Sequence, residues 1–170
     1  MCGIVGVFAR DGSPVDMATL VAMRDTMRHR GPDDKGAWQN ERRDVAIGHR
    51  RLAIVDLSSA GRAPMGNEDG SVQVTFNGEI YNHADLRSGL ERRGHRFRSR
   101  CDTEVLVHLW EEHGPAMVDR LVGMFSFAIW DAGAERMFVA RDRLGIKPLY
   151  WLDDGCRFAC AGSGRTGIPP

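Results

Sequence analysis

The sequence has no excess of charge of either sign, because 23 lysines and arginines balance 23 aspartates and glutamates. A protein that binds mainly to nucleic acid or to an anionic membrane surface usually carries a basic patch or a net positive charge. Paired arginines occur, as at Arg50-Arg51, but acidic residues elsewhere offset them. We therefore expect no nucleic acid and no membrane among the partners of this chain.

Cysteine is scarce, and its four positions are scattered along the chain at Cys2, Cys101, Cys156 and Cys160. A disulfide-stabilised secreted domain needs a denser framework, and a zinc site built from cysteines needs a second ligand pair. We expect four reduced thiols in a cytoplasmic protein. The cysteine spacing predicts no metal site.

Long apolar runs are also missing, since none reaches the roughly 18 residues of a membrane-spanning helix. The first residues contain no basic segment ahead of an apolar one, so a secretory signal peptide is not expected. This expectation bears on chemistry, because a cleaved leader would remove Cys2.

What is present is the composition of an ordinary soluble domain, with 42% hydrophobic residues in a chain of 170. A domain of this size buries roughly 70% of the surface of its unfolded chain. Apolar spacing and turn residues divide it into alternating strands and helices. The predicted strands cover residues 4–8, 45–48, 52–55, 72–76, 124–130 and 136–140. Three predicted helices follow the N-caps Asp16, Asn82 and Asp102. The first of these helices is predicted to end at Gly31-Pro32 and the third at Gly114-Pro115.

The segment 124–130 is apolar on both faces and is followed by a tight turn at 131–134. A strand of this kind must be covered on both sides, and so short a connection joins antiparallel strands. The pattern predicts an α+β fold of stacked layers rather than a parallel, doubly wound sheet.

The amino terminus reads Met1-Cys2-Gly3, ahead of the apolar strand. Removal of Met1 would leave one residue with both a thiol and a free α-amine. Unperturbed, these groups titrate near pH 8.5 and near pH 7.7–8.0. They would supply a nucleophile and its base, although a cysteine at this position is more often an ordinary residue.

Four loop segments are richer in polar groups than folding alone requires: 29–34, 48–56, 76–82 and 141–150. Together with residues 1–6 they resemble, in order, the motifs of the class II (N-terminal nucleophile) glutamine amidotransferases. The sequences of 29–33, 77–82 and 145–150 are most similar to the glutaminase domain of glutamine-hydrolysing asparagine synthetases. The resemblance implies a four-layer αββα sandwich with two mostly antiparallel sheets between helical layers.

The resemblance also implies a reaction in which Cys2 attacks the side-chain amide of L-glutamine and releases ammonia from a thioester. Asn77, through its side-chain amide, and Gly78, through its backbone N–H, would form the oxyanion hole. No metal or cofactor is expected for this step. Asn77-Gly78 is also a common turn dipeptide, and without the resemblance it would be assigned to a hairpin.

Recognition of free glutamine is implied for a further set of residues. Arg51 would bind the α-carboxylate, Glu79 and Asp102 would bind the α-ammonium, and backbone groups at Ile54 and Val55 would assist. Arg51 could instead be half of a surface pair with Arg50, and Asp102 could serve only as a helix N-cap.

Two histidines, His29 and His49, lie in these segments. They invite a cysteine–histidine pair, but the α-amine removes the need for one. We expect both histidines to be structural.

The resemblance ends near residue 159, and we expect residues 160–170 to be a divergent, disordered tail beyond an amidotransferase domain of residues 1–159. A synthetase domain is not found in the sequence, so ATP and magnesium are expected only on a separate synthetase domain or chain that takes up the ammonia. The final acceptor carboxylate is left open. The alternative is a non-catalytic module that binds a partner or senses glutamine.

Overall fold

A computed structural model describes residues 1–54 and 56–163 of the chain. Within them, the strands form two sheets in which neighbouring strands are antiparallel. The five-stranded sheet has the order β2 (Asp34–Gln39), β3 (Val45–Arg51), β1 (Gly3–Ala9), β9 (Arg157–Ala161) and β8 (Tyr150–Asp153). The four-stranded sheet has the order β4 (Met65–Gly66), β5 (Val72–Ile80), β6 (Gly123–Asp131) and β7 (Arg136–Arg141).

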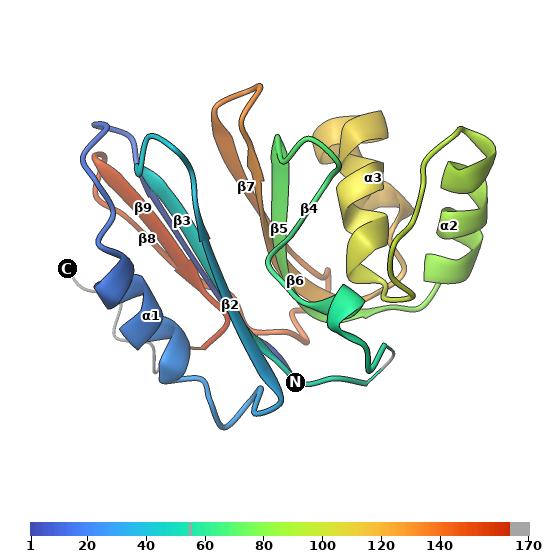
Figure 1. Cartoon of the computed structure of the whole chain (residues 1–170), viewed down its shortest axis with the longest axis horizontal. Coiled ribbons are helices and arrows are strands. Elements are labelled where there is room, and N and C mark those ends of the chain that lie inside the picture. Colours follow the sequence, from blue (N-terminus) through green and yellow to red (C-terminus); the bar gives the residue numbers. More distant parts are fainter. Residues whose placement is uncertain (55, 164–170) are drawn as a thin grey trace.

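The two sheets lie face to face between helices (Figure 1). Helix α1 (Met17–Asp25) covers the outer face of the five-stranded sheet, and α3 (Thr103–His113) covers the outer face of the other. Helix α2 (His83–Arg92) packs on α3, and two short 3₁₀ helices, η1 (Ser59–Gly61) and η2 (Gly114–Arg120), lie in connections. The α+β, four-layer αββα prediction is confirmed. Among the described residues, no helix is long and apolar enough to cross a membrane.

Helix α1 begins as predicted, because the Asp16 carboxylate accepts hydrogen bonds from the backbone N–H groups of Ala18 and Thr19. Its buried residues and Met27, just beyond it, pack on β1 and β3. The predicted end of the helix at Gly31 is wrong, since α1 stops at Asp25. Gly31 has another role: a Cβ there would lie 2.4 Å from the Arg50 carbonyl carbon, so only glycine permits this close approach to β3.

Strand β6 is buried on both faces, as its sequence predicts. Phe127 and Ile129 face α3 in the larger apolar core, and Trp130 on the opposite face meets Phe8 of β1 with ring centroids 5.2 Å apart. Burying a side chain such as Phe127 contributes about 1.5–3 kcal/mol. The core therefore fixes β6 and its neighbour β5, on which site residues lie.

One strand assignment near the site is wrong. Residues 52–54 form a loop instead of a strand, and Ile54 is 70% exposed. The backbone N–H groups of Leu52 and Ala53 are bound by the Cys2 sulfur and the Asp33 carboxylate, so side chains replace a strand partner.

The predicted boundary at residue 159 falls inside β9. Cys160 and Ala161 are fully buried and pair with Gly6 and Val5 of β1, so they belong to the folded domain. The sequence does not indicate that the strand continues to Ala161, because the segment Cys160-Ala161-Gly162 is short and only weakly apolar. Residues 164–170 lie outside the described residues, and the predicted disorder of that segment stays a prediction.

Candidate active site

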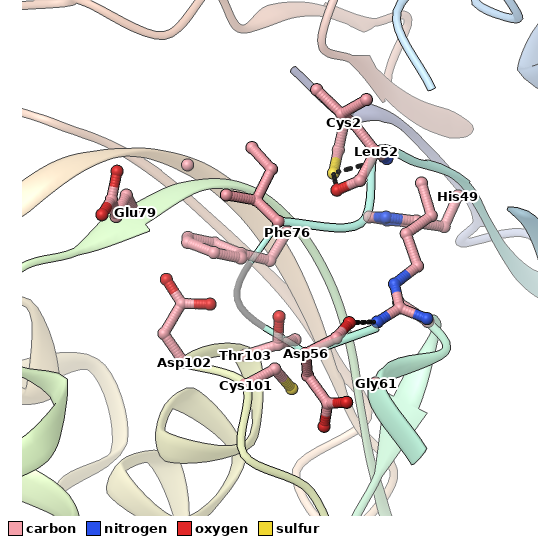
Figure 2. A pocket seen from close by; sticks show the side chains of 14 residues that line it. Cys2, His49, Leu52, Asp56, Gly61, Phe76, Glu79, Cys101, Asp102 and Thr103 are labelled. Carbon is pink, nitrogen blue, oxygen red and sulfur yellow. Dashed lines mark hydrogen bonds between the residues drawn. The ribbon is translucent and has the colours of Figure 1, made fainter. Parts of the chain in front are cut away.

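A pocket lies where the start of β1, the end of β3, the last part of β5 and the approach to α3 meet. Six of the predicted catalytic and substrate-binding residues line it: Cys2, Arg51, Ile54, Gly78, Glu79 and Asp102. Figure 2 shows Cys2 at one end of the pocket and the carboxylates of Glu79 and Asp102 on one side of it. Asn77 does not line the pocket but adjoins Gly78 in β5, and Val55 lies outside the described residues.

The Cys2 sulfur is held against the 52–61 loop. The backbone N–H of Leu52 donates to Sγ at 3.4 Å, and the thiol faces the Leu52 carbonyl at 3.8 Å. Burial raises the pKa of the Cys2 thiol above its ordinary value. At neutral pH the group is therefore a thiol, and it needs a base before it can attack a carbonyl carbon.

Two cations surround the amino terminus. The Arg30 Nε donates to the Cys2 carbonyl at 3.2 Å, and the buried Lys147 ammonium lies 3.2 Å from the Met1 sulfur. Burial, Arg30 and Lys147 all lower the pKa of the Met1 α-amine. The surroundings of the Met1 α-amine therefore favour its neutral form, which is the form able to accept a proton.

Asn77 is buried, and neither its Nδ2 nor its Oδ1 has a hydrogen-bond partner among the described residues. Because side chains alternate along a strand, Asn77 shares a face of β5 with Thr75. Thr75 reaches across to the five-stranded sheet and contacts His49. Leaving a buried amide unpaired costs the folded state about 1–3 kcal/mol. The presence of Asn77 here is therefore not explained by the stability of the fold and indicates a functional role.

Gly78 lies next to Asn77 in the last part of β5, where it pairs with β6, and not in a hairpin turn. A Cβ at this position would lie 2.2 Å from the Met124 carbonyl oxygen. Only glycine therefore fits between the pocket and β6 without moving the strand.

The Arg51 guanidinium is buried at the end of β3 and is not a surface group. Its Nη1 donates to the Ser58 carbonyl at 2.9 Å, and its Nη2 donates to the Asp56 carbonyl. Since a guanidinium has five N–H donors, these bonds orient Arg51 and leave others for a ligand.

Asp56 is a positioning residue that the sequence analysis did not single out. Its carboxylate accepts from the Ser58 hydroxyl at 2.6 Å and from the Arg100 N–H at 2.9 Å, and it thus joins the 52–61 loop to the segment before α3. The hydrogen bond from Ser58 is the main reason that the pKa of Asp56 falls to about 2. The Asp-x-Ser spacing at 56–58, typical of a side-chain-stabilised turn, was the available signal.

Asp102 precedes α3, yet its side chain does not cap the helix. The predicted capping role is wrong, because the carboxylate turns to β5 and accepts from the Ile80 N–H at 2.9 Å. Burial raises the pKa of Asp102, and the neighbouring Glu79 carboxylate adds to this rise. The two carboxylates form the acidic side of the pocket.

His49 also lines the pocket, and its Nδ1 lies 3.0 Å from the Thr75 hydroxyl. That hydroxyl donates to the Gly48 carbonyl at 3.1 Å, so it accepts from His49 Nδ1–H. Burial lowers the pKa of His49 to about 3, and the ring stays neutral at ordinary pH. His29 binds the Thr26 carbonyl on the surface, away from the pocket.

Comparison with known proteins bears directly on this pocket. The profile of a family described as "Glutamine amidotransferase domain" matches residues 1–166. The chain belongs to this family. It is a class II glutamine amidotransferase domain, with its cysteine at the amino-terminal end of the site.

Two relatives of this amidotransferase domain are glutamine-hydrolysing asparagine synthetases. One, from Bacillus subtilis, is 42% identical over 161 residues, which are 93% of this chain and 26% of that protein. Another, from Arabidopsis thaliana, is 46% identical over 158 residues, which are 91% of this chain and 26% of that protein. The chain thus spans about a quarter of the length of these relatives.

A solved structure shares the fold of the amidotransferase domain. It is the glutamine phosphoribosylpyrophosphate amidotransferase of B. subtilis, complexed with ADP and GMP. The TM-score is 0.77 at 23% identity, and the match covers 95% of this chain and 42% of that one. The likeness supports the layered fold of two sheets between helices.

Proposed function

We propose that this domain hydrolyses L-glutamine to glutamate and ammonia through a thioester on Cys2. The observation that carries the proposal is the combination of groups in one pocket: a thiol, a buried guanidinium and two carboxylates. A guanidinium and a pair of carboxylates complement the α-carboxylate and α-ammonium of a free amino acid. The thiol is left for its side-chain amide, and the unpaired amide of Asn77 lies next to the pocket residue Gly78 in β5.

In the proposed reaction Met1 has been removed, and the neutral α-amine of Cys2 accepts the thiol proton. The thiolate sulfur forms a bond to the Cδ of glutamine, and the amide oxygen becomes an oxyanion. Asn77 Nδ2–H and Gly78 N–H donate to that oxyanion. The ammonium form of the amine then protonates the departing nitrogen, the C–N bond breaks, and water later hydrolyses the thioester to glutamate.

Recognition is assigned to the remaining groups. Arg51 pairs with the α-carboxylate of glutamine, and Glu79 and Asp102 hold the α-ammonium. Backbone groups at Ile54 and Val55 complete the site. This arrangement selects free glutamine over a glutamine side chain within a protein, which has neither charged group.

Replacing Asp102 by asparagine tests the recognition step. We expect Asp102→Asn to raise KM for glutamine roughly 10- to 100-fold, the value of one hydrogen bond between charged groups, with little change in kcat. The amide oxygen can still accept from the Ile80 N–H, so the fold is preserved. Steady-state ammonia release over a glutamine series measures both constants, and a fall in kcat with unchanged KM would contradict the role.

The titration of Asp102 predicts a pH dependence that the Asp102→Asn variant should lack. Burial raises the pKa of Asp102 in the folded chain above its value in the unfolded chain. The protonated carboxyl group therefore contributes stability at low pH, and this contribution is lost as pH rises through the raised pKa. Asp102→Asn removes this loss and should not lower the melting temperature at neutral pH. In the wild type, KM should increase as pH falls through the raised pKa of Asp102, and this increase should weaken in the variant.

Removal of Met1 is the test of the proposed function as a whole. Protein that retains Met1, shown by intact mass, should release no ammonia from glutamine, because its Cys2 nitrogen is a peptide nitrogen. Treatment with methionine aminopeptidase should lower the mass by one methionine residue and produce activity. Equal activity before and after treatment would contradict the mechanism, and activity in neither state would favour the alternative of a glutamine-sensing or partner-binding module.

The released ammonia needs an acceptor, for which we propose an activated carboxylate on an ATP- and magnesium-dependent synthetase domain or chain. The asparagine synthetases among the relatives, about four times as long as this chain, support that pairing. Exposed apolar side chains on the loop beside the pocket, Ile54 and Leu57, suit contact with another protein surface. The four free cysteines support a reducing, cytoplasmic location.

A further inference from the structure

A cluster of imidazole and carboxylate groups lies at the C-terminal end of α3. His108, Glu111 and Glu112 come from the helix, and His95 comes from the segment between α2 and α3. At a rise of 1.5 Å per residue, Glu111 is roughly 13 Å along the helix from Asp102. The cluster is therefore separate from the pocket that contains Cys2, and the proposed reaction does not use it.

The ligand atoms of this cluster converge. Glu111 Oε2 lies 2.8 Å from His108 Nδ1 and 3.5 Å from His95 Nδ1, and the three residues offer atoms within 4.8 Å of one another. Around a tetrahedral zinc ion with bonds of about 2.0–2.1 Å, neighbouring ligand atoms lie about 3.3 Å apart. Small side-chain adjustments would bring the three atoms to those separations.

Two further residues form hydrogen bonds to His95 and Glu111 and orient their side chains. His95 Nε2 lies 2.9 Å from Glu112 Oε1, and the Asn67 amide donates to Glu111 Oε1 at 2.9 Å. A carboxylate on one ring nitrogen fixes the tautomer that leaves the other nitrogen free to bind a metal. Glu112 thus directs the lone pair of His95 Nδ1 toward Glu111.

His108 is fixed by packing. It is 2% exposed, and its ring lies 4.7 Å from the His95 ring and 4.8 Å from the Phe97 ring between centroids. Its orientation toward Glu111 therefore does not depend on a flexible surface rotamer.

We infer that His95, His108 and Glu111 bind a divalent transition metal ion such as Zn²⁺, with Glu112 and Asn67 positioning two of the ligands. Two imidazoles and one carboxylate are a ligand set that suits zinc and leaves a fourth position for water. The ion would join the α2–α3 segment to α3. The competing explanation is a protonated His95 that bridges the carboxylates of Glu111 and Glu112 without a metal.

Zinc titration of the full chain tests this site. The Cys2→Ala variant is the starting protein, because an amino-terminal thiol is itself a zinc ligand. We expect calorimetry to show one Zn²⁺ bound per chain, and Co²⁺ to give the visible absorption of a four-coordinate site. Adding His95→Ala should abolish both signals, and adding Glu112→Gln should weaken binding roughly 10- to 100-fold.

His29→Ala in the same background is the matched control, because His29 is an exposed histidine outside the cluster, and it should bind Zn²⁺ unchanged. Circular dichroism would establish that the His95→Ala protein is folded, and Glu112→Gln supplies a milder second variant. The inference is overturned if no zinc binds to the Cys2→Ala protein, if binding survives His95→Ala, or if His29→Ala weakens binding equally. Because glutamine hydrolysis is not the readout, failure of this site leaves the proposed function unaffected.

Discussion

Replacing Cys2 by alanine is expected to lower the rate of glutamine hydrolysis by roughly 10⁴-fold or more, while glutamine still binds. The proposed thioester cannot form without the sulfur, and the α-amine has no thiol proton to accept. The charged groups assigned to glutamine come from other elements: Arg51 from β3, Glu79 from β5 and Asp102 from the approach to α3. Ammonia release measures the rate, and calorimetry with glutamine measures the dissociation constant.

Cys101→Ala is the matched control for this prediction. Cys101 lines the same pocket and is buried, but its sulfur lies 3.0 Å from the Ser99 hydroxyl, and no step of the reaction is assigned to it. We expect the Cys101→Ala rate to stay close to that of the wild type. Residual hydrolysis in Cys2→Ala near the wild-type rate, or an equal loss in Cys101→Ala, would contradict the assignment of Cys2 as the nucleophile.

The layered fold was predictable from local sequence because its strongest signals are local. The segment 124–130 is apolar on both faces, and a strand with that pattern must lie between two layers. Asp16 followed by an apolar stripe likewise predicts α1. The weak strands β2 and β8 were missed, because Asp34–Gln39 and Tyr150–Asp153 lack a clear apolar alternation and are formed by pairing with β3 and β9.

For the site, the sequence predicts which residues take part but not the contacts between them. The site residues were identified through sequence motifs. Their contacts join segments that are distant in the chain, so the spacing of neighbouring residues does not indicate them. Asp102 is placed like a helix cap, yet it binds Ile80, 22 residues away. Residues 52–54 are apolar like a strand, yet the Cys2 sulfur, 50 residues away, takes the N–H of Leu52 that a strand partner would bind.

Lys147 illustrates the same limit. Its segment was recognised as unusually polar, but nothing in its sequence indicates a buried ammonium beside the amino terminus. The Asp142 carboxylate creates that placement, because it accepts from the N–H groups of Ile146 and Lys147 and from that of Phe125 in β6. The turn is thereby fixed to the sheet, and the Lys147 side chain is directed toward Met1.

Replacing Asn77 by leucine is expected to lower kcat by about 10²–10³-fold, the usual effect of removing one oxyanion-hole donor, with a smaller effect on KM. The fold should not suffer. Both amide atoms of Asn77 are buried without a partner among the described residues, so an apolar side chain of similar size removes an unmet hydrogen-bonding demand. We expect the free energy of unfolding to rise by about 1 kcal/mol. Steady-state kinetics and denaturant unfolding of the same preparations measure the two effects.

Ser126→Ala separates this loss of catalysis from a packing defect. Ser126 lies directly opposite Asn77 on β6, and its hydroxyl is likewise buried and unpaired among the described residues. It should therefore gain stability in the same way but keep the wild-type kcat. A fall in kcat in Ser126→Ala as large as that in Asn77→Leu would assign the loss to strand packing. A loss of kcat confined to Asn77→Leu, with stability retained, would mean that the fold tolerates an unpaired amide at this position because the amide stabilises the oxyanion.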